Sequence, residues 1–383
     1  MPARGSFRRR NVTWVFTCDS GLAPRASTCR AWVLPSGSDP SHPGAVPRLV
    51  RWDPPTVPFR AEHVPVDREY LRRAADRGEI VRLIRGVYVG ASGVATTAVD
   101  HHLQRALAYQ MHFPTPIVAS HETAAAALGL PLLRSGVLPD QPRFILDPGH
   151  GSHRHRRPRI RVVPLPAHQC QTVAEGPFEG LRVTTPERTA LDLAADLPLP
   201  EGLMALDFVA RRRALYHVDP MALRGEVAAE VIRDAMSALL AVDRGLGRRG
   251  ARRRRIALAL TDPRHESPAE SASVGHMFLA GFPMPEVQVR FSTCRGERFL
   301  DFYWPEWRVG GECDGALKYR GGDSAEGQRA ADSRRVEEKR RAMELEREHG
   351  LMIVPWLGYE ALYRPTVFLS SLANALRLRG AQW

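Results

Sequence analysis

The sequence predicts an α/β protein with three ordered parts, and two patterns support that fold class. Short segments rich in β-branched and aromatic residues alternate with segments of helical periodicity along most of the chain. Near the C-terminus the order is strand, helix, strand, which favours a right-handed parallel crossover. The 383 residues, 44% of them hydrophobic, suffice for two or three domains with ordinary cores.

The charge and cysteine content indicate a class of partner and a compartment. The formal net charge of +12 comes from an excess of arginine and favours a polyanionic partner, above all nucleic acid. Overuse of Arg codons in a GC-rich genome would give the same excess. The five cysteines form no C-x-x-C pair and suit a reducing cytoplasm, which is the expected location. No apolar run approaches the roughly 20 residues that span a bilayer.

The N-terminal part divides into a disordered extension and a small ordered unit. Residues 1–52 are rich in Pro, Ser, Gly and Arg without a helical or strand period, and are expected to be disordered. The sequence leaves open whether they belong to the natural protein. Within residues 53–95, a short helix ends at Gly78, and a basic, partly alternating segment bends at Gly86. A helix followed by a basic β-ribbon is a winged-helix outline.

This unit carries a first family resemblance. The stretch LRRAADRGEIVRLIRGVYV resembles the N-terminal winged helix of the AbiEi antitoxins of type IV toxin–antitoxin systems. The resemblance implies DNA binding and transcriptional autoregulation, and it leaves open a cognate toxin or a homodimer. The phosphate contacts that it implies are Arg72, Arg73, Arg77, Arg82 and Arg85. A solvated, charged helix face is the alternative.

Residues 96–262 are predicted to form a mixed α/β middle region. A helix at 96–111 precedes a strand at Ile117 and an Ala-rich helix, and further strands are expected at RFILD and RIRVVPL. The segments SHETAAAALGLPL and TTPERTALDLA also resemble AbiEi-like proteins. Four residues could be mistaken for a ligand set, but each has a capping or surface role available: His121, Glu122, Glu187 and Asp192.

Two basic runs, at residues 150–159 and 244–255, interrupt the middle region. Each lies among Gly or Pro and lacks an apolar face, so both are expected to be mobile loops that contact nucleic-acid backbones. The expected contacts are Arg252, Arg253, Arg254 and Arg255, with Arg335 in the C-terminal region as a further one. The histidines of the first run are not expected to bind metal, because neighbouring guanidinium groups repel a cation.

Residues 263–383 are expected to form the C-terminal α/β domain. A helix begins with Ser267 as cap, Pro268 at its first position and Glu270 at its third, which is an S-x-x-E capping box. Two strands follow in ERFLDFYWPEWRVGGECDG. A charged helix then ends at Gly350, before the apolar strand LMIVPW.

Acidic residues gather in the two strands of this domain. Because side chains alternate along a strand, Asp301 and Glu312 are expected to meet across the hairpin, with Asp314 on the Glu312 side. Burying several carboxylates in one cleft costs several kcal/mol for each unless cations neutralise them. Oxygen ligands without His or Cys favour Mg²⁺ or Mn²⁺. The predicted metal ligands are Asp301, Glu312 and Glu270.

A second resemblance covers roughly residues 263–360. SPAES, FLDFYWP, ECDG and EEKRRAMELEREHGLMIVPW resemble the short Vsr-like endonuclease domains of the PD-(D/E)XK superfamily, whose fold is restriction-endonuclease-like. The resemblance implies a Mg²⁺-dependent phosphodiesterase. Asp314 stands where the superfamily has lysine, so Lys318 or Lys339 is expected to supply the ammonium group. Asp314 is then either a third metal ligand or an acceptor for backbone amides in the turn.

Two functions from different classes follow from these patterns. The first is a metal-dependent endonuclease with an attached AbiEi-like DNA-binding region. The second is a DNA-binding, antitoxin-like transcriptional regulator whose nuclease fold is inactive. The sequence does not distinguish DNA from RNA as the substrate, and it identifies neither a recognised sequence nor an oligomeric state.

Overall fold

The computed structural model describes residues 4–9, 12–17, 52–133, 138–150, 158–227, 229–314 and 340–382. The chain divides into two compact units, Met1–Asp53 and Pro54–Trp383. In the first unit, β1 (Arg4–Arg9) and β2 (Val12–Thr17) pair in antiparallel fashion. That residues 1–52 form a disordered extension stays a prediction, and these two segments are described parts of it. The sequence of β2, VTWVFT, carries the β-branched and aromatic residues that favour strands.

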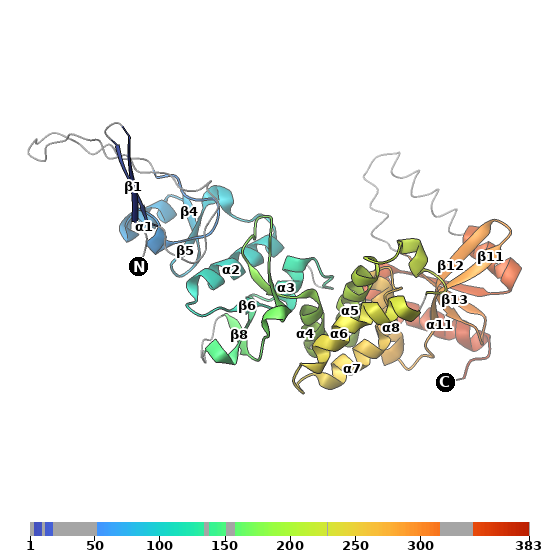
Figure 1. Ribbon diagram of the computed structural model, residues 1–383. Coiled ribbons are helices and arrows are strands. Elements are labelled where there is room, and N and C mark those ends of the chain that lie inside the picture. Colours follow the sequence, from blue (N-terminus) through green and yellow to red (C-terminus); the bar gives the residue numbers. More distant parts are fainter. Residues whose placement is uncertain are drawn as a thin grey trace, which may run out of the picture. The chain divides into compact units, whose positions relative to one another are not determined.

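The second unit begins with a small sheet and one helix. Its elements are β3 (Phe59–Arg60), α1 (Arg68–Asp76), β4 (Ile80–Ile84) and β5 (Val87–Gly90), and the strand order is β3-β5-β4 (Figure 1). The Asp67 side chain caps α1 by accepting a 2.7 Å hydrogen bond from Tyr70 N. Gly78 and Gly86 have positive φ angles of 72° and 80°, as expected for a helix end and a tight hairpin.

A five-stranded mixed sheet follows, in the order β8-β7-β6-β10-β9. The strands are β6 (Val118–Ala119), β7 (Arg143–Leu146), β8 (Arg159–Val162), β9 (Cys170–Thr172) and β10 (Arg182–Thr184). Helices α2 (Ala98–His112) and α3 (His121–Leu128) share a core with it through Leu103, Ala124 and Phe144. Ala108 of α2 also packs against Val87 and Val89 of β5, so the β4–β5 hairpin and the middle region share apolar contacts.

Four helices form the next layer of the chain. They are α4 (Pro186–Asp196), α5 (Leu199–Ala214), α6 (Ala229–Arg244) and α7 (Ala251–Leu260). The prediction of a mobile loop at residues 244–255 is therefore wrong for residues 251–255, which belong to α7. Ile256, Ala257 and Leu258 follow the arginines, and Ala257 and Leu258 contribute apolar packing to the helical core. Apolar packing thus outweighs the local crowding of positive charge.

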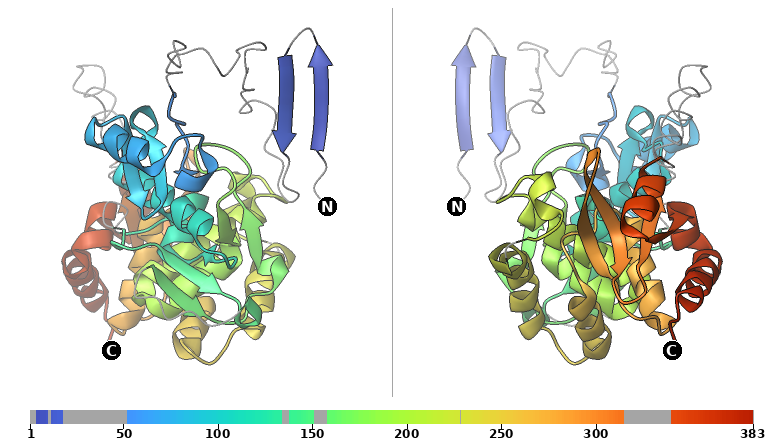
Figure 2. Two further views of the ribbon diagram at one scale, coloured as in Figure 1. Left: turned by 90° about the vertical axis from the view of Figure 1, so that its left-hand side faces the viewer. Right: turned by 90° about the vertical axis from the view of Figure 1, so that its right-hand side faces the viewer.

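The C-terminal region is a four-stranded sheet packed against helices. Its strands are β11 (Glu286–Thr293), β12 (Gly296–Trp304), β13 (Val309–Asp314) and β14 (Met352–Leu357). Neighbouring strands are antiparallel except for the parallel pair β13–β14, as the strand, helix, strand pattern predicts. The associated helices are α8 (Pro268–Leu279), residues 340–349, α10 (Gly358–Tyr363) and α11 (Pro365–Leu378). In Figure 2 the red C-terminal helices lie beside the orange strands.

Stacked aromatic rings hold this sheet against its helices. The Trp356 ring stacks on Phe302 at 5.4 Å and on Phe368 of α11 at 5.2 Å, measured between ring centroids. Close packing around β13 requires residues without side chains at its centre. A Cβ atom on Gly311 would lie 2.6 Å from the Trp356 ring, and one on Gly310 would lie 2.7 Å from Ile353.

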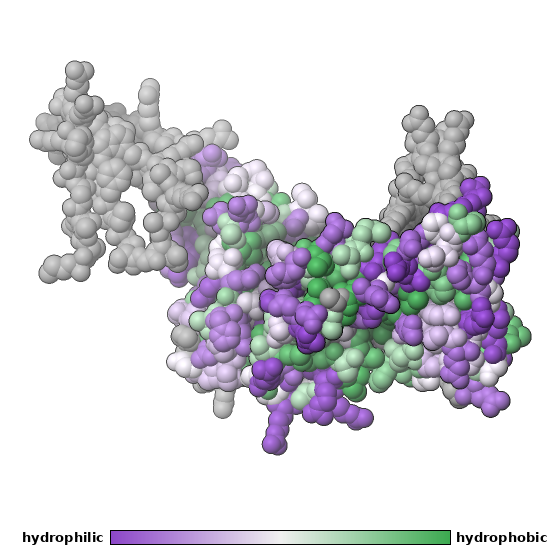
Figure 3. Space-filling view, turned by 45° about the vertical axis from the view of Figure 1, so that its right-hand side comes forward, coloured by the Kyte–Doolittle hydropathy of each residue, from purple (hydrophilic) through white to green (hydrophobic). Residues whose placement is uncertain are grey.

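On one face of the second unit, hydrophobic residues are gathered between hydrophilic areas (Figure 3). Phe278, Leu279 and Met284 are among the exposed large hydrophobic side chains. Within the described ranges, no helix combines the length and apolar character needed to cross a membrane.

We predict that Gly311→Ala destabilises the protein by about 1–3 kcal/mol, because the added methyl group must displace a packed indole ring. Gly247→Ala is the matched control, since no atom lies within 4 Å of the position its Cβ would take. Urea denaturation of both variants measures the difference. Equal stability of the two variants would show that the sheet can move to make room.

Candidate functional site

A row of three polar residues crosses the C-terminal sheet. The pairs Val287↔Phe302 and Val289↔Leu300 set Gln288 of β11 opposite Asp301 of β12. On the other side of β12, Phe302 pairs with Gly311 of β13. In an antiparallel pair the next residues, Asp301 and Glu312, are then also opposite each other. The expected meeting of Asp301 and Glu312 across the hairpin agrees with this register.

Glu270 reaches the row from the first turn of α8. Ser267 caps the helix through Glu270 N, and its hydroxyl donates to Glu270 Oε1 at 2.8 Å. Glu270 Oε2 accepts a 2.8 Å hydrogen bond from Glu266 N, so the carboxylate both caps the helix and is held in place. The Gln288 amide bridges the two acids, because its Nε2 lies 3.1 Å from Asp301 Oδ1 and 3.4 Å from Glu270 Oε2.

Gln288 has a strained backbone at this position. Its φ angle is 52°, which is uncommon for a residue other than glycine, and its side chain is buried. Its carbonyl accepts a 2.8 Å hydrogen bond from the backbone N–H of Gly225, which lies outside the sheet. Backbone strain of this kind collects at functional sites, because packing there must hold one side chain in a fixed direction. No sequence pattern signals Gln288, since it reads as an ordinary strand residue.

Burial and mutual repulsion raise the pKa values of the acids. Burial raises the pKa of Asp301 well above its usual value, and the charges of Glu270 and Glu312 add to the effect. The hydrogen bonds from Cys313 N, at 2.8 Å, and from Gln288 act in the opposite direction. Burial also raises the pKa of Glu270. Two acids with raised pKa values side by side are a feature of functional sites.

The acidic cluster has the donor chemistry for a hard divalent cation. Among the described residues, no group of three or more His, Cys, Asp or Glu side chains is arranged to hold a metal ion. Glu270 and Asp301 are nevertheless two neighbouring carboxylates joined by a carboxamide. Glu270 Oε1 and both Asp301 oxygens each accept one hydrogen bond, which leaves a second lone pair on each. These two residues fit a cation in chemical type, and Glu312 is the third acid nearby.

The remaining predicted residues of this site differ in what the structure describes. Asp314 ends β13, two residues beyond Glu312 on the same strand. Lys318, Lys339 and Arg335 lie outside the described residues. Which residue supplies an ammonium group to the acidic cluster therefore stays a prediction.

The raised pKa of Asp301 gives a prediction about stability and pH. Between the pKa of the unfolded chain and the higher folded pKa, the folded state binds more protons, so wild-type stability falls as pH rises through that window. Asp301→Asn removes this loss. In EDTA, we expect the variant to gain stability relative to wild type from pH 4 to pH 7. Urea denaturation across this range measures it, and a difference that stays constant with pH would contradict the raised pKa.

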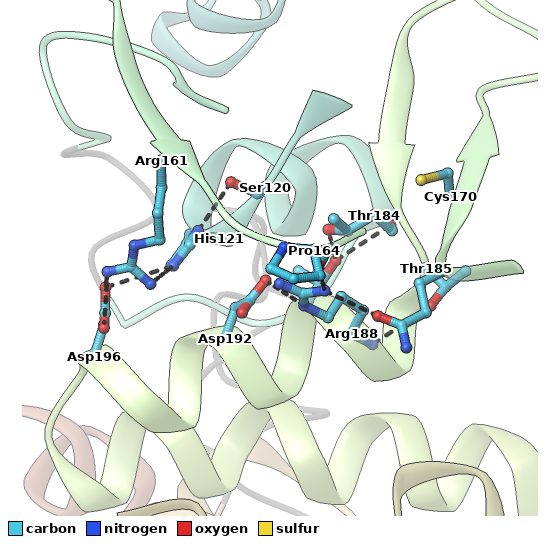
Figure 4. A network of polar contacts seen from close by, with 12 residues as sticks. Ser120, His121, Arg161, Pro164, Cys170, Thr184, Thr185, Arg188, Asp192 and Asp196 are labelled. Atoms are coloured by element: carbon cyan, nitrogen blue, oxygen red, sulfur yellow. Dashed lines mark hydrogen bonds and ion pairs between the residues drawn. The ribbon is translucent and has the colours of Figure 1, made fainter. Parts of the chain in front are cut away.

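A second polar network lies in the middle region (Figure 4). Asp196 of α4 accepts from Arg161 at 3.0 Å and from Arg143 at 2.5 Å, and it lies 3.4 Å from His121 Nε2. His121 is buried with a φ angle of 51°, and its Nδ1 contacts Ser120 Oγ at 2.9 Å. The hydrogen bond with His121 lowers the pKa of Asp196, with a further contribution from Arg143.

Figure 4 also shows a buried ion pair between Arg188 and Asp192 of α4. Arg188 Nε donates to Asp192 at 3.0 Å, and its Nη1 donates to Gln169 Oε1 at 2.9 Å. The predicted capping or surface roles of His121 and Asp192 are thus wrong, because both side chains are buried. Arg188 of α4 neutralises Asp192, and Arg161 of β8 neutralises Asp196 beside His121. These contacts join helices to the five-stranded sheet, so the residues serve as scaffold.

The predicted phosphate contacts of the N-terminal unit are all exposed. Arg72 and Arg73 pair with Glu69, and Arg77 pairs with Glu79 at 2.8 Å. The hydrogen bond from Arg72 is the largest influence that lowers the pKa of Glu69, to about 2. Arg82 and Arg85 lie on and beside the hairpin strand β4. Exposed pairs of this kind contribute little to stability, so the guanidinium groups can exchange partners.

The basic run on α7 separates into two kinds of residue. Arg252, Arg253 and Arg255 are exposed on the helix. Arg254 is buried, and it donates to Asp243 Oδ1 and to the carbonyls of Gly247 and Arg249. The prediction that Arg254 contacts nucleic acid is therefore wrong, because helical periodicity turns this side chain inward.

Comparison with known proteins identifies one part of the chain. A family model for the AbiEi antitoxin C-terminal domain matches residues 117–240. The match confirms the AbiEi-like interpretation of the middle region, and it ends before the acidic cluster. Among solved structures, the RV2827C protein from Mycobacterium tuberculosis is similar at 15% sequence identity and a TM-score of 0.34, over 60% of this chain and 78% of that chain. No curated protein matches the chain.

Proposed function

We propose that the protein is a DNA-binding, antitoxin-like transcriptional regulator. The observation that carries this proposal is the match of residues 117–240 to the AbiEi antitoxin C-terminal domain. The net charge of +12 supports it, since the protein would be attracted to a polyanion. A cognate toxin is the protein partner that such a function implies.

The N-terminal unit is the proposed DNA-binding element. The order β3, α1, β4, β5 provides one helix followed by a hairpin, which is the second half of a winged helix. Arg72, Arg73 and Arg77 belong to the helix or its end, and Arg82 and Arg85 to the hairpin. Contacts from these residues to phosphates would position the helix but would not read sequence. Binding of the full chain to the DNA upstream of its own gene, compared with random DNA, tests this function. Equal affinity for the two would contradict autoregulation.

The α7 arginines give a prediction that separates binding from stability. Replacing Arg252, Arg253 and Arg255 by Ala should weaken binding to all DNA sequences alike and reduce the salt slope by up to about 0.9 for each lost contact. Thermal stability should stay close to wild type. Arg254→Ala should instead destabilise the fold by about 3 kcal/mol, because it leaves Asp243 and two carbonyls without their donor. Fluorescence anisotropy and denaturation measure both effects. An unchanged salt slope in the triple variant would remove α7 from the DNA-binding surface.

A second candidate function is metal-dependent phosphodiester hydrolysis. It is favoured by the contact of Gln288 with both Asp301 and Glu270, because this places two acids of raised pKa in one site. A bound Mg²⁺ or Mn²⁺ ion would activate water and neutralise charge on the phosphate. The chain itself would hold that ion through Asp301 and Glu270, with Gln288 fixing the direction of both carboxylates.

We predict that millimolar Mn²⁺ stabilises the wild-type protein and supports cleavage of plasmid, single-stranded DNA or RNA. Asp301→Asn should lose both effects while remaining folded. Glu297→Gln is the control, since Glu297 is an exposed acid on the same strand. Calorimetry and gel assays give the two readouts. If wild type neither binds Mn²⁺ nor cuts any of the three substrates, the regulator function stands alone.

A further inference from the structure

Arg224, in the middle region, lies beside the acidic cluster of the C-terminal sheet. It follows the short helix η5 (Pro220–Leu223). Its Nε and Nη2 donate to Oε1 and Oε2 of Glu266 at 2.7 and 2.6 Å, which is a bidentate ion pair. Glu266 is the residue whose backbone N–H holds the Glu270 carboxylate. One side of the cluster is therefore formed by a segment outside the C-terminal domain.

Electrostatics links Arg224 to the two acids. The hydrogen bonds to Glu266 raise the pKa of Arg224 most, and the charges of Asp301 and Glu270 raise it further. The guanidinium lies 5.8 Å from the centre of the Phe299 ring, and the side chain is about one-third exposed. It is a cation beside buried acids that still has access to solvent.

The backbone next to Arg224 is fixed to the same site. Gly225 N donates to the carbonyl of Gln288, the strained residue that bridges Asp301 and Glu270. Gly225 also has a positive φ angle of 73°, and a Cβ atom there would lie 3.4 Å from Phe299. A cavity of about 850 Å³ adjoins this junction, and Gly225, His265 and Gln288 are part of its lining.

We propose that Arg224 is a phosphate-contacting residue of the acidic cluster, which makes the site a composite of the middle region and the C-terminal sheet. The proposal rests on the second candidate function. A metal held by Asp301 and Glu270 would bind one oxygen of a phosphodiester, and Arg224 would donate to another. Guanidinium suits this role because its N–H groups match phosphate geometry and keep their charge.

Glu266 competes for Arg224 in this arrangement. The Glu266 carboxylate accepts hydrogen bonds from both Nε and Nη2 of Arg224. A phosphodiester must share or displace that carboxylate. Replacing Glu266 should therefore strengthen phosphodiester binding. If the ion pair were purely structural, replacing either Arg224 or Glu266 would instead lower stability and binding.

The test measures binding of a thymidine dinucleotide phosphodiester to the full chain in Ca²⁺ by calorimetry, and cleavage in Mn²⁺. Arg224→Met should weaken dinucleotide binding and lower kcat, each by about tenfold or more, with Mn²⁺ affinity unchanged. Arg224→Lys should recover part of the loss. Glu266→Gln should tighten dinucleotide binding by about two- to fivefold. Arg233→Met is the control, because it removes an arginine from an exposed ion pair, with Glu230 on α6.

The outcomes separate the two ideas. Equal binding by wild type and Arg224→Met, or no dinucleotide binding by wild type, would overturn the phosphate contact. Parallel losses in Arg224→Met and Glu266→Gln, with lowered melting temperatures, would show that the pair only joins η5 to α8, and would overturn it as well. Absence of cleavage by wild type would remove the nuclease function, while the dinucleotide comparison would still decide the role of Arg224.

Discussion

Mutual repulsion among Glu270, Asp301 and Glu312 is the constraint on which the C-terminal region depends. Burial raises the free-energy cost of each negative charge, so the fold must either keep protons on the acids or bring positive charge and hydrogen-bond donors to them. It brings donors from β13 (Cys313 N), from β11 (Gln288) and from the residues before α8 (Glu266 N and the Ser267 hydroxyl). The strained backbone of Gln288 is the local cost of directing one of these donors.

The middle region handles buried acids in a different way. Asp192 is neutralised by Arg188 within α4, whereas the pairs of Asp196 with Arg143 and Arg161 hold α4 to the five-stranded sheet. A buried acid with an arginine partner has a structural task and little capacity to bind a cation. In the C-terminal cluster, Gln288 stands between the two acids instead, and the charges of both acids raise the pKa of Arg224. This contrast distinguishes scaffold from candidate site within one chain.

The positive charge of the protein is divided in the same manner. Arg254, Arg188 and Arg143 are bound to acids and carbonyls inside the structure, so they add to the net charge without offering a surface to nucleic acid. The exposed arginines of α1, the β4–β5 hairpin and α7 keep their guanidinium groups accessible to solvent. A sequence-level count of basic residues therefore overstates the binding surface, and burial decides which residues remain available.

The sequence by itself determined several elements and the positions of the acids along the C-terminal strands. Ser267, Pro268 and Glu270 set the start of α8, Gly78 and Gly86 set the ends of α1 and β4, and strand alternation set Asp301 opposite Glu312, because capping, positive φ and period-2 geometry are local properties. Only the tertiary structure brought Gln288 and Arg224 to those acids, turned Arg254 inward and buried His121. These placements depend on which distant segments pack together, and a lone polar residue carries no periodic signal of its future neighbour.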